Sequence, residues 1–199
     1  MKIARRLSLL LGLTIAMPAI AVPTPIAERY AMGAVKADFK ARQRIGTKRA
    51  GLVCLPAGSF LWSDARAGLN NASASVATIL HDAAPAVVDT ADDPFSDEAG
   101  ATRYKIIATI VNFQLNGCVR NWGMAARLSH KHALSGRAHL SVGWDVFDRT
   151  TRAKAEHQTI DTEFDLTSDV DDAAGALSEG LKRNAAEFAK QRLSAAPHR

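Results

Sequence analysis

The sequence predicts a single α/β domain of the α+β kind, with a mixed sheet of four or five strands packed by two helices. Three stretches carry this prediction: a β-hairpin pattern at about residues 137–166, an apolar strand pattern at residues 103–115, and an alanine-rich amphipathic pattern near the C-terminal end. The chain has 199 residues, of which 47% are hydrophobic and 23% charged. This length and composition suit one domain with an ordinary core.

The hairpin at 137–166 has the clearest pattern in the chain. Its first strand alternates apolar residues with polar ones, the apolar set being Ala138, Leu140, Val142, Trp144 and Val146. This period of two is typical of a strand with one buried face, so Trp144 is predicted to be a core residue. A polar loop at 148–152 follows, and Asp148 is suited to open a type I turn by accepting a hydrogen bond from the backbone ahead of it. The return strand is expected from about Ala153 to Leu166.

The first 21 residues resemble a secretory signal peptide. Lys2, Arg5 and Arg6 precede an apolar run at 7–15, and Ala19-Ile20-Ala21 fits the small-x-small pattern of a cleavage site. We expect cleavage at about Ala21 and a periplasmic or secreted protein, with an uncleaved anchor as the alternative. The apolar run is short for a membrane span, so no stable membrane insertion is expected after cleavage.

The remaining elements follow in order along the chain. Residues 22–50 are predicted to form a basic N-terminal arm or a loosely packed helix from about Ile26 to Arg42, because their large apolar residues are thinly spaced. The α/β domain is expected to span 51–193, with a tail at 194–199. Within it, short extended stretches flank a turn at Gly58.

The central part of the domain is predicted to contain a helix, a short strand and a long strand. The helix covers about 64–84, with apolar residues at helical spacing, and Val87-Val88 is a candidate short strand before an acidic loop at 89–100. Residues 103–115 are apolar on both faces of a strand, which indicates a strand covered on both sides. A loop is expected at 116–135. Capping residues at 168–172 begin the last helix, which is expected to reach about Leu193.

The charge pattern gives little support to nucleic-acid binding. The formal net charge is +5, but Lys2, Arg5 and Arg6 lie in the signal segment, and without them 22 basic residues face 20 acidic ones. Basic and acidic residues alternate in blocks along the chain. Solvated faces that balance internally explain this pattern, and a polar docking surface is the alternative.

Cys54 and Cys118 are the two cysteines of the chain. Export would place them in an oxidising compartment, and both lie near predicted strand ends, so we expect a disulfide between them. Two free buried thiols and a catalytic thiol are the alternatives, although no histidine is placed with either cysteine by a known motif.

No catalytic motif is present: the sequence contains neither a Gly-x-Ser-x-Gly elbow nor a phosphate-binding glycine loop. His130 and His132 could bind a transition metal if they lie on one side of a strand, but solvent-exposed loop histidines explain them as well. No catalytic residue, metal or cofactor is therefore predicted. Arg120, Trp122 and Arg127 are candidate binding residues, because an exposed aromatic beside arginine is a common interface anchor. Packing of the loop on itself is the alternative.

The order of elements resembles that of small α/β domains of bacterial envelope accessory proteins. The residues that carry the resemblance are VCLPAGSFLW, YKIIATIVNF and the hairpin LSVGWDVFDRTTRAKAEHQT, within residues 51–193. The class includes the amino-terminal domain of the Tol translocation protein, curli-secretion-type components and activator lipoproteins of peptidoglycan synthases. The resemblance implies a non-catalytic module that binds an envelope protein or complex. A secreted metal-dependent hydrolase using His130 and His132 is the alternative function, and a structural protein of the envelope is a third.

Overall fold

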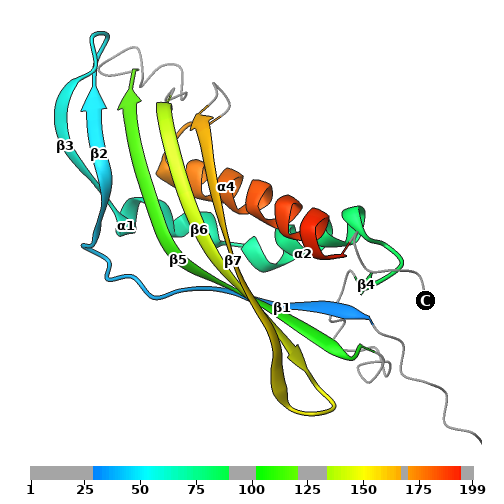
Figure 1. Ribbon diagram of the computed structural model, residues 1–199. Coiled ribbons are helices and arrows are strands. Elements are labelled where there is room, and N and C mark those ends of the chain that lie inside the picture. The colour runs from blue at the N-terminus through cyan, green and yellow to red at the C-terminus, as the bar shows by residue number, and fades with distance from the viewer. Residues whose placement is uncertain (1–28, 90–101, 121–133, 167–169, 194–199) are drawn as a thin grey trace, which may run out of the picture.

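A computed structural model describes residues 29–89, 102–120, 134–166 and 170–193 (Figure 1). These residues form one mixed seven-stranded sheet, and the α-helices of the described segments lie on one of its faces. The predicted α/β fold class is therefore confirmed, but the sheet has seven strands instead of four or five. The predicted signal peptide at 1–21 and tail at 194–199 lie outside the described residues.

The sheet is arranged around its longest strand, β5 (Tyr104–Val119). On one side, β5 pairs antiparallel with β6 (Leu134–Asp148), which pairs antiparallel with β7 (Ala153–Leu166). On the other side, β5 pairs in parallel first with β1 (Tyr30–Ala37) and then with β2 (Arg44–Ala50). Two short strands complete the sheet: β3 (Leu55–Leu61) pairs antiparallel with β2, and β4 (Val88–Asp89) pairs in parallel with β1.

The N-terminal segment differs from its prediction. The expected arm or helix within 22–50 is wrong for the described part, where the chain forms β1 and β2. These strands bury few large side chains, chiefly Met32 and Ile45, so their sequence carries only a weak strand pattern. Their backbone groups are instead satisfied by β5, more than sixty residues further along the chain.

A β-bulge in β5 explains why that strand is apolar on both faces. The pairing with β6 shifts between Ile110 and Asn112, so the alternation of side chains changes phase there. Ile110 before the bulge and Phe113 after it are both buried toward the helices, whereas Val111 at the bulge is 57% exposed. The expectation of a strand covered on both sides is wrong for this reason. The expected loop at 116–135 also begins later, since β5 continues to Val119.

The helices cover one face of the sheet. The predicted helix at 64–84 is divided into α1 (Trp62–Ala65), a 3-10 turn (Arg66–Leu69) and α2 (Ala72–Ala83). The turn passes so close to the last helix that a Cβ on Gly68 would meet the backbone of Ala174. The last helix, α4 (Ala173–Phe188), ends in a π-helical turn (Ala189–Leu193), and the side chain of Asp172 caps its first turn by accepting from Gly175 N at 2.7 Å.

A buried polar contact fixes α4 on the sheet. Trp144 is fully buried and stacks on Phe188 of α4, with 4.4 Å between the ring centroids. Its Nε1 donates to Oδ1 of Asn184 at 2.8 Å, and Nδ2 of Asn184 donates to Ile160 O and to Thr162 Oγ1, each at 2.8 Å. Trp144 is thus a core residue, as predicted, and its indole N–H is satisfied by a buried amide that also holds the edge strand β7.

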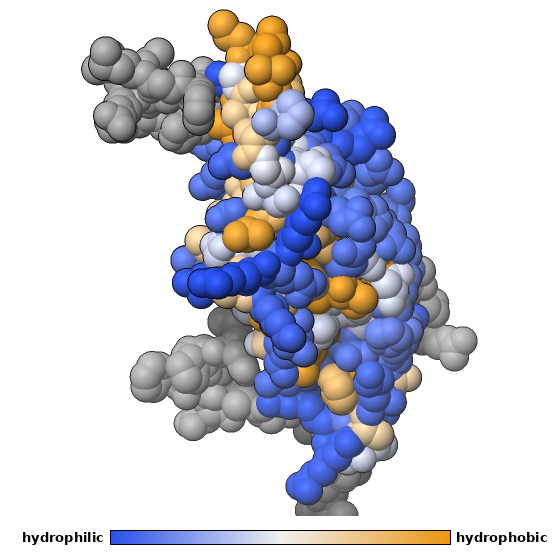
Figure 2. Space-filling view, turned by 90° about the vertical axis from the view of Figure 1, so that its left-hand side faces the viewer, coloured by the Kyte–Doolittle hydropathy of each residue, from blue (hydrophilic) through white to orange (hydrophobic). Residues whose placement is uncertain are grey.

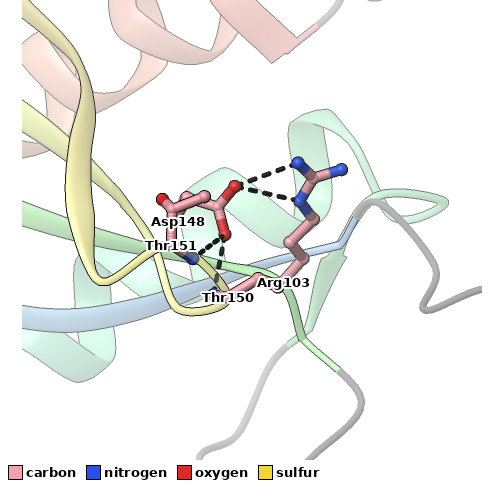
Figure 3. A network of polar contacts seen from close by, with 4 residues as sticks. All are labelled: Arg103, Asp148, Thr150 and Thr151. Atoms are coloured by element: carbon pink, nitrogen blue, oxygen red, sulfur yellow. Dashed lines mark hydrogen bonds and ion pairs between the residues drawn. The ribbon is translucent and has the colours of Figure 1, made fainter.

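The β6–β7 turn is closed by Asp148, in the role that the sequence predicts (Figure 3). Oδ1 accepts from Thr150 N at 2.8 Å, while Oδ2 accepts from Arg103 Nε at 3.1 Å and from Nη2 at 3.0 Å. These hydrogen bonds join the turn to the residue that precedes β5. Arg103 lowers the pKa of Asp148; burial acts in the opposite direction but is outweighed.

Replacing Asn184 should destabilise the fold. The Asn184→Leu variant keeps a similar volume but leaves the indole N–H of Trp144 buried without its partner, so we expect a loss of about 2 to 4 kcal/mol in the free energy of unfolding. Urea titration measures this loss. Lys182→Leu, at an exposed position of the same helix, is the control and should change stability by less than about 0.5 kcal/mol. Equal stability of the two variants would contradict the role of Asn184.

The contribution of Asp148 should depend on pH. Because the folded-state pKa of Asp148 is lowered, its carboxylate stabilises the fold above the unfolded-state pKa of about 3.9, and this contribution is lost as the pH falls through the folded-state value. Asp148→Asn should therefore lower the melting temperature at neutral pH, and the difference from the parent should shrink at acidic pH. Asp171→Asn, at an exposed position, serves as the control. A difference that is constant with pH would refute the proposed ion pair.

Candidate functional site

The disulfide lies at one end of the sheet and confirms the predicted pair. Cys54 is in the turn between β2 and β3, Cys118 is near the end of β5, and their Cα atoms are 5.5 Å apart. Strand pairing brings them together, because Ala50 is opposite Val119 and Gly51 N donates to Val119 O at 3.1 Å. The turn after β2 thereby meets the end of β5. We call this region, comprising residues 47–55, 116–120 and 134–136, the disulfide end.

A polar groove crosses the disulfide end on the face of the sheet opposite the helices. It has a volume of about 500 Å³ and is lined by Thr47, Arg49, Cys54, Asn116, Gly117, Cys118, Ser135 and Gly136. Oδ1 of Asn116 accepts from Thr47 Oγ1 at 2.6 Å and from Thr47 N at 3.2 Å, which fixes the amide on the groove floor. Gly136 has φ 141°, and a side chain there would collide with the backbone of Asn116.

A second hollow extends the groove toward β7. It shares Asn116 with the first, has a volume of about 310 Å³, and is also lined by Gln114, Arg137, His139 and Glu163. Arg137 is paired there with Glu163 at 3.2 Å and with Asp165 at 3.3 Å, and the hydrogen bond to Asp165 is the main cause that raises its pKa. This part of the surface is therefore charged but internally compensated.

Two other arginines of the disulfide end are not compensated in this way. Arg49 and Arg120 form no ion pair with any acidic group in the part of the chain that the structure describes. Arg120, a predicted binding residue, is exposed and lies directly after β5, two residues beyond Cys118. The other predicted binding residues, Trp122 and Arg127, lie outside the described residues.

An apolar tip projects from the same end. The turn and the start of β3 expose Leu52 by 94%, Val53 by 76% and Leu55 by 63%. Figure 2 shows apolar side chains gathered at the top of the molecule, at the end where Figure 1 places the β2–β3 turn. The predicted turn at Gly58 is wrong, because the chain turns at 51–54 and β3 runs through Gly58, so the sequence does not predict this tip. The apolar run LVCL between two basic residues and a proline was the available signal.

A cluster of polar side chains around Asp145 lies further along the same sheet face; we call it the Asp145 cluster. Asp145 binds Lys154 Nζ and His157 Nδ1, both at 2.7 Å, and Nε2 of His157 is 3.4 Å from Thr159 Oγ1. Partial burial acts to raise the pKa of Asp145, but the hydrogen bonds from Lys154 and His157 outweigh it, so the pKa is lowered. The order Asp–His–Thr is that of a catalytic relay, yet the ring is half-exposed and Lys154 shares the carboxylate. Cross-strand ion pairing explains this cluster.

The metal hypothesis receives no support from the described residues. Within them, no group of three or more His, Cys, Asp or Glu side chains could hold a metal ion. His130 and His132 lie outside these residues, so the hypothesis of a hydrolase that uses them stays a prediction. Among the helices of the described segments, none combines the length and apolar character needed to cross a membrane.

Comparison with known proteins yields likenesses of overall shape. No protein-family model and no curated protein matches the chain. A DUF330 protein from Xanthomonas campestris has a similar structure, with 12% identity, a TM-score of 0.48, and coverage of 86% of this chain and 89% of that one. The PelC dodecamer from Paraburkholderia phytofirmans has 13% identity, a TM-score of 0.41, and coverage of 82% and 87%.

A minor lipoprotein from Acinetobacter baumannii is also similar, with 9% identity, a TM-score of 0.31, and coverage of 84% of this chain and 89% of that one. All three TM-scores are below 0.5, and we draw no functional conclusion from them. The more specific resemblance to Tol translocation, curli-secretion and peptidoglycan-synthase activator domains stays a prediction.

Removing the disulfide should destabilise the protein and loosen the tip. The bond joins residues separated by 64 positions, so the Cys54→Ser/Cys118→Ser variant should lose about 2 to 4 kcal/mol of unfolding free energy. Denaturant titration measures the loss, and hydrogen exchange at the backbone amides of positions 51 and 54 reports the loosening. Reductant should destabilise the parent by a similar amount and leave the variant unchanged. A parent protein insensitive to reductant would contradict a structural role for the bond.

Proposed function

We propose that this protein is an exported, non-catalytic accessory module of the bacterial cell envelope, and that it acts by binding an envelope protein through the disulfide end. The observation that carries the proposal is the polar groove of about 500 Å³, which Arg49 lines; Arg120 follows in the chain two residues after the lining residue Cys118. Arginine is enriched among residues that anchor protein interfaces, because its planar group makes several directed hydrogen bonds. A partner that presents carboxylates could satisfy both arginines.

The construction of the disulfide end also supports binding. Disulfides persist in oxidising compartments, in keeping with a protein that works outside the cytoplasm. The bond and the Thr47–Asn116 contacts hold the groove in one shape, which reduces the entropy lost when a partner binds. The Asp145 cluster on the same face is explained by the ion pair between Asp145 and Lys154, so the described residues favour recognition over catalysis.

The edges of the sheet make strand addition a poor mode of binding. β3 contains Pro56, which lacks a backbone N–H, and its pairing with β2 is irregular at two places. The outer strand β7 carries charged side chains along its length, including Lys154 and Glu163. These features discourage pairing with another strand. The groove and its arginines are therefore the better candidate for a specific contact.

Site-directed photo-crosslinking in living cells tests the proposal. A photoreactive amino acid at Ser135, on the groove, should capture a reproducible envelope protein, whereas the same group at Ala155, an exposed position on β7, should not. Arg120→Ala should reduce the captured amount at least several-fold, and Trp122→Ala and Arg127→Ala test the two other predicted binding residues. Arg152→Ala, in the β6–β7 turn, is the matched control.

Two results would refute this function. One is the absence of any protein adduct specific to Ser135. The other is a catalytic activity of the purified protein that is abolished by His130→Ala or His132→Ala, which would establish the hydrolase instead. Each variant is first compared with the parent by thermal unfolding, so that a loss of capture is not confused with a loss of fold.

A further inference from the structure

The apolar tip has an arrangement that the fold itself does not require. Leu52, Val53 and Leu55 fall within four consecutive residues and are all more than 60% exposed. A single exposed aliphatic side chain is ordinary on a protein surface, but a cluster at a projecting turn marks a site of contact. The tip is also held in place, because Cys54 between these residues is bonded to β5.

Basic side chains lie directly below the tip on both faces of the β2–β3 hairpin. Nζ of Lys48 is 5.8 Å from the ring centroid of Phe60, which is buried toward the helices, whereas Arg49 lines the groove on the opposite face. The hairpin sequence around the tip is free of acidic residues: residues 45–63 include Lys48 and Arg49 but no aspartate or glutamate. The tip is therefore apolar at its end and positive at its base.

We propose that this tip seats in the surface of a membrane that contains anionic lipids. Leu52, Val53 and Leu55 would enter the boundary between headgroups and acyl chains, and Lys48 would meet the anionic headgroups, with the positive charge of Arg49 close by. The inference rests on the proposed function, to which it adds the surface on which the module works. With the tip in the lipid, the groove would lie close to the membrane, where it could contact envelope proteins located there.

The shape of the tip favours lipid over a protein or a second copy of this chain. A stable protein interface needs about 800 Å² on each partner, and a narrow projecting turn with three aliphatic side chains cannot supply that area alone. Lipids need no complementary shape, and they accept apolar side chains with a positive rim. The constraint from the disulfide reduces the conformational freedom that the tip could lose on binding.

Acidic residues at the same end do not oppose this orientation. Glu163 and Asp165 are on β7, which β6 and β5 separate from β2. Both are paired with Arg137 of β6. Their charge is thus locally compensated, whereas the basic charge of Arg49 is not compensated within the described residues.

Vesicle co-sedimentation of the exported, purified protein tests the inference. One vesicle type contains equal parts of phosphatidylcholine and phosphatidylglycerol, and the other contains phosphatidylcholine alone. Intact mass confirms that the N-terminal apolar segment has been removed, since that segment could itself bind lipid. We expect binding to the anionic vesicles that weakens with added salt, and at least tenfold weaker binding for Leu52→Ser/Val53→Ser. Val111→Ser, which alters an exposed valine on the open sheet face, should bind within twofold of the parent.

Two vesicle results would overturn the inference: no binding of the parent to anionic vesicles, or equal binding by the tip variant. A third contrary result is concentration-dependent dimerisation of the parent that is lost in the tip variant, because it would identify a second copy of the chain as the occupant. Sedimentation velocity without lipid detects the dimer. Crosslinking from Ser135 separates these results from the proposed function, because it reports the groove. Protein capture without vesicle binding would overturn the inference alone, and absence of both would overturn the function as well.

Discussion

The pairing of β5 on both of its sides is the constraint on which the rest of the structure depends. This strand supplies partners to β6 along its length, to β1 near its start and to β2 near its end. Its bulge at Val111 turns the apolar residues of both halves toward the same helices. Without the phase change, Phe113 and Leu115 would face away from the helical layer. One irregularity thus allows a sixteen-residue strand to serve a core on a single side.

Because helices cover one face of the sheet, its other face is exposed to solvent and carries polar side chains that pair with one another. Ion pairs across β6 and β7 do this, with Arg137 beside Asp165 and Asp145 bound to Lys154. Charge is thereby balanced across β6 and β7, whereas Arg49 and Arg120 at the disulfide end lack acidic partners among the described residues. The contrast matters more than the number of charges, since paired groups have less to gain from an external ligand.

Local patterns in the sequence were sufficient for the parts of the fold that depend on near neighbours. The hairpin was predicted with its turn at Asp148, because alternation and turn chemistry both lie within thirty residues. The disulfide was predicted from strand ends and compartment. In contrast, β1 and β2 were missed because their pairing is parallel and long-range, and their own apolar residues are few. The apolar tip was missed because exposure depends on where a turn ends in space, which the residues LVCL do not reveal.

The position of the disulfide connects these observations. Neither Cys54 nor Cys118 belongs to the main core, which lies between the helices and the sheet. The effect of the disulfide is to hold a turn whose side chains, Leu52 and Val53, gain little burial from folding. Hydrophobic packing therefore cannot keep this turn in one conformation, and a covalent bond can. The disulfide lies between the groove and the apolar tip, where hydrophobic packing is absent. It therefore keeps this contact surface in one shape before a partner binds.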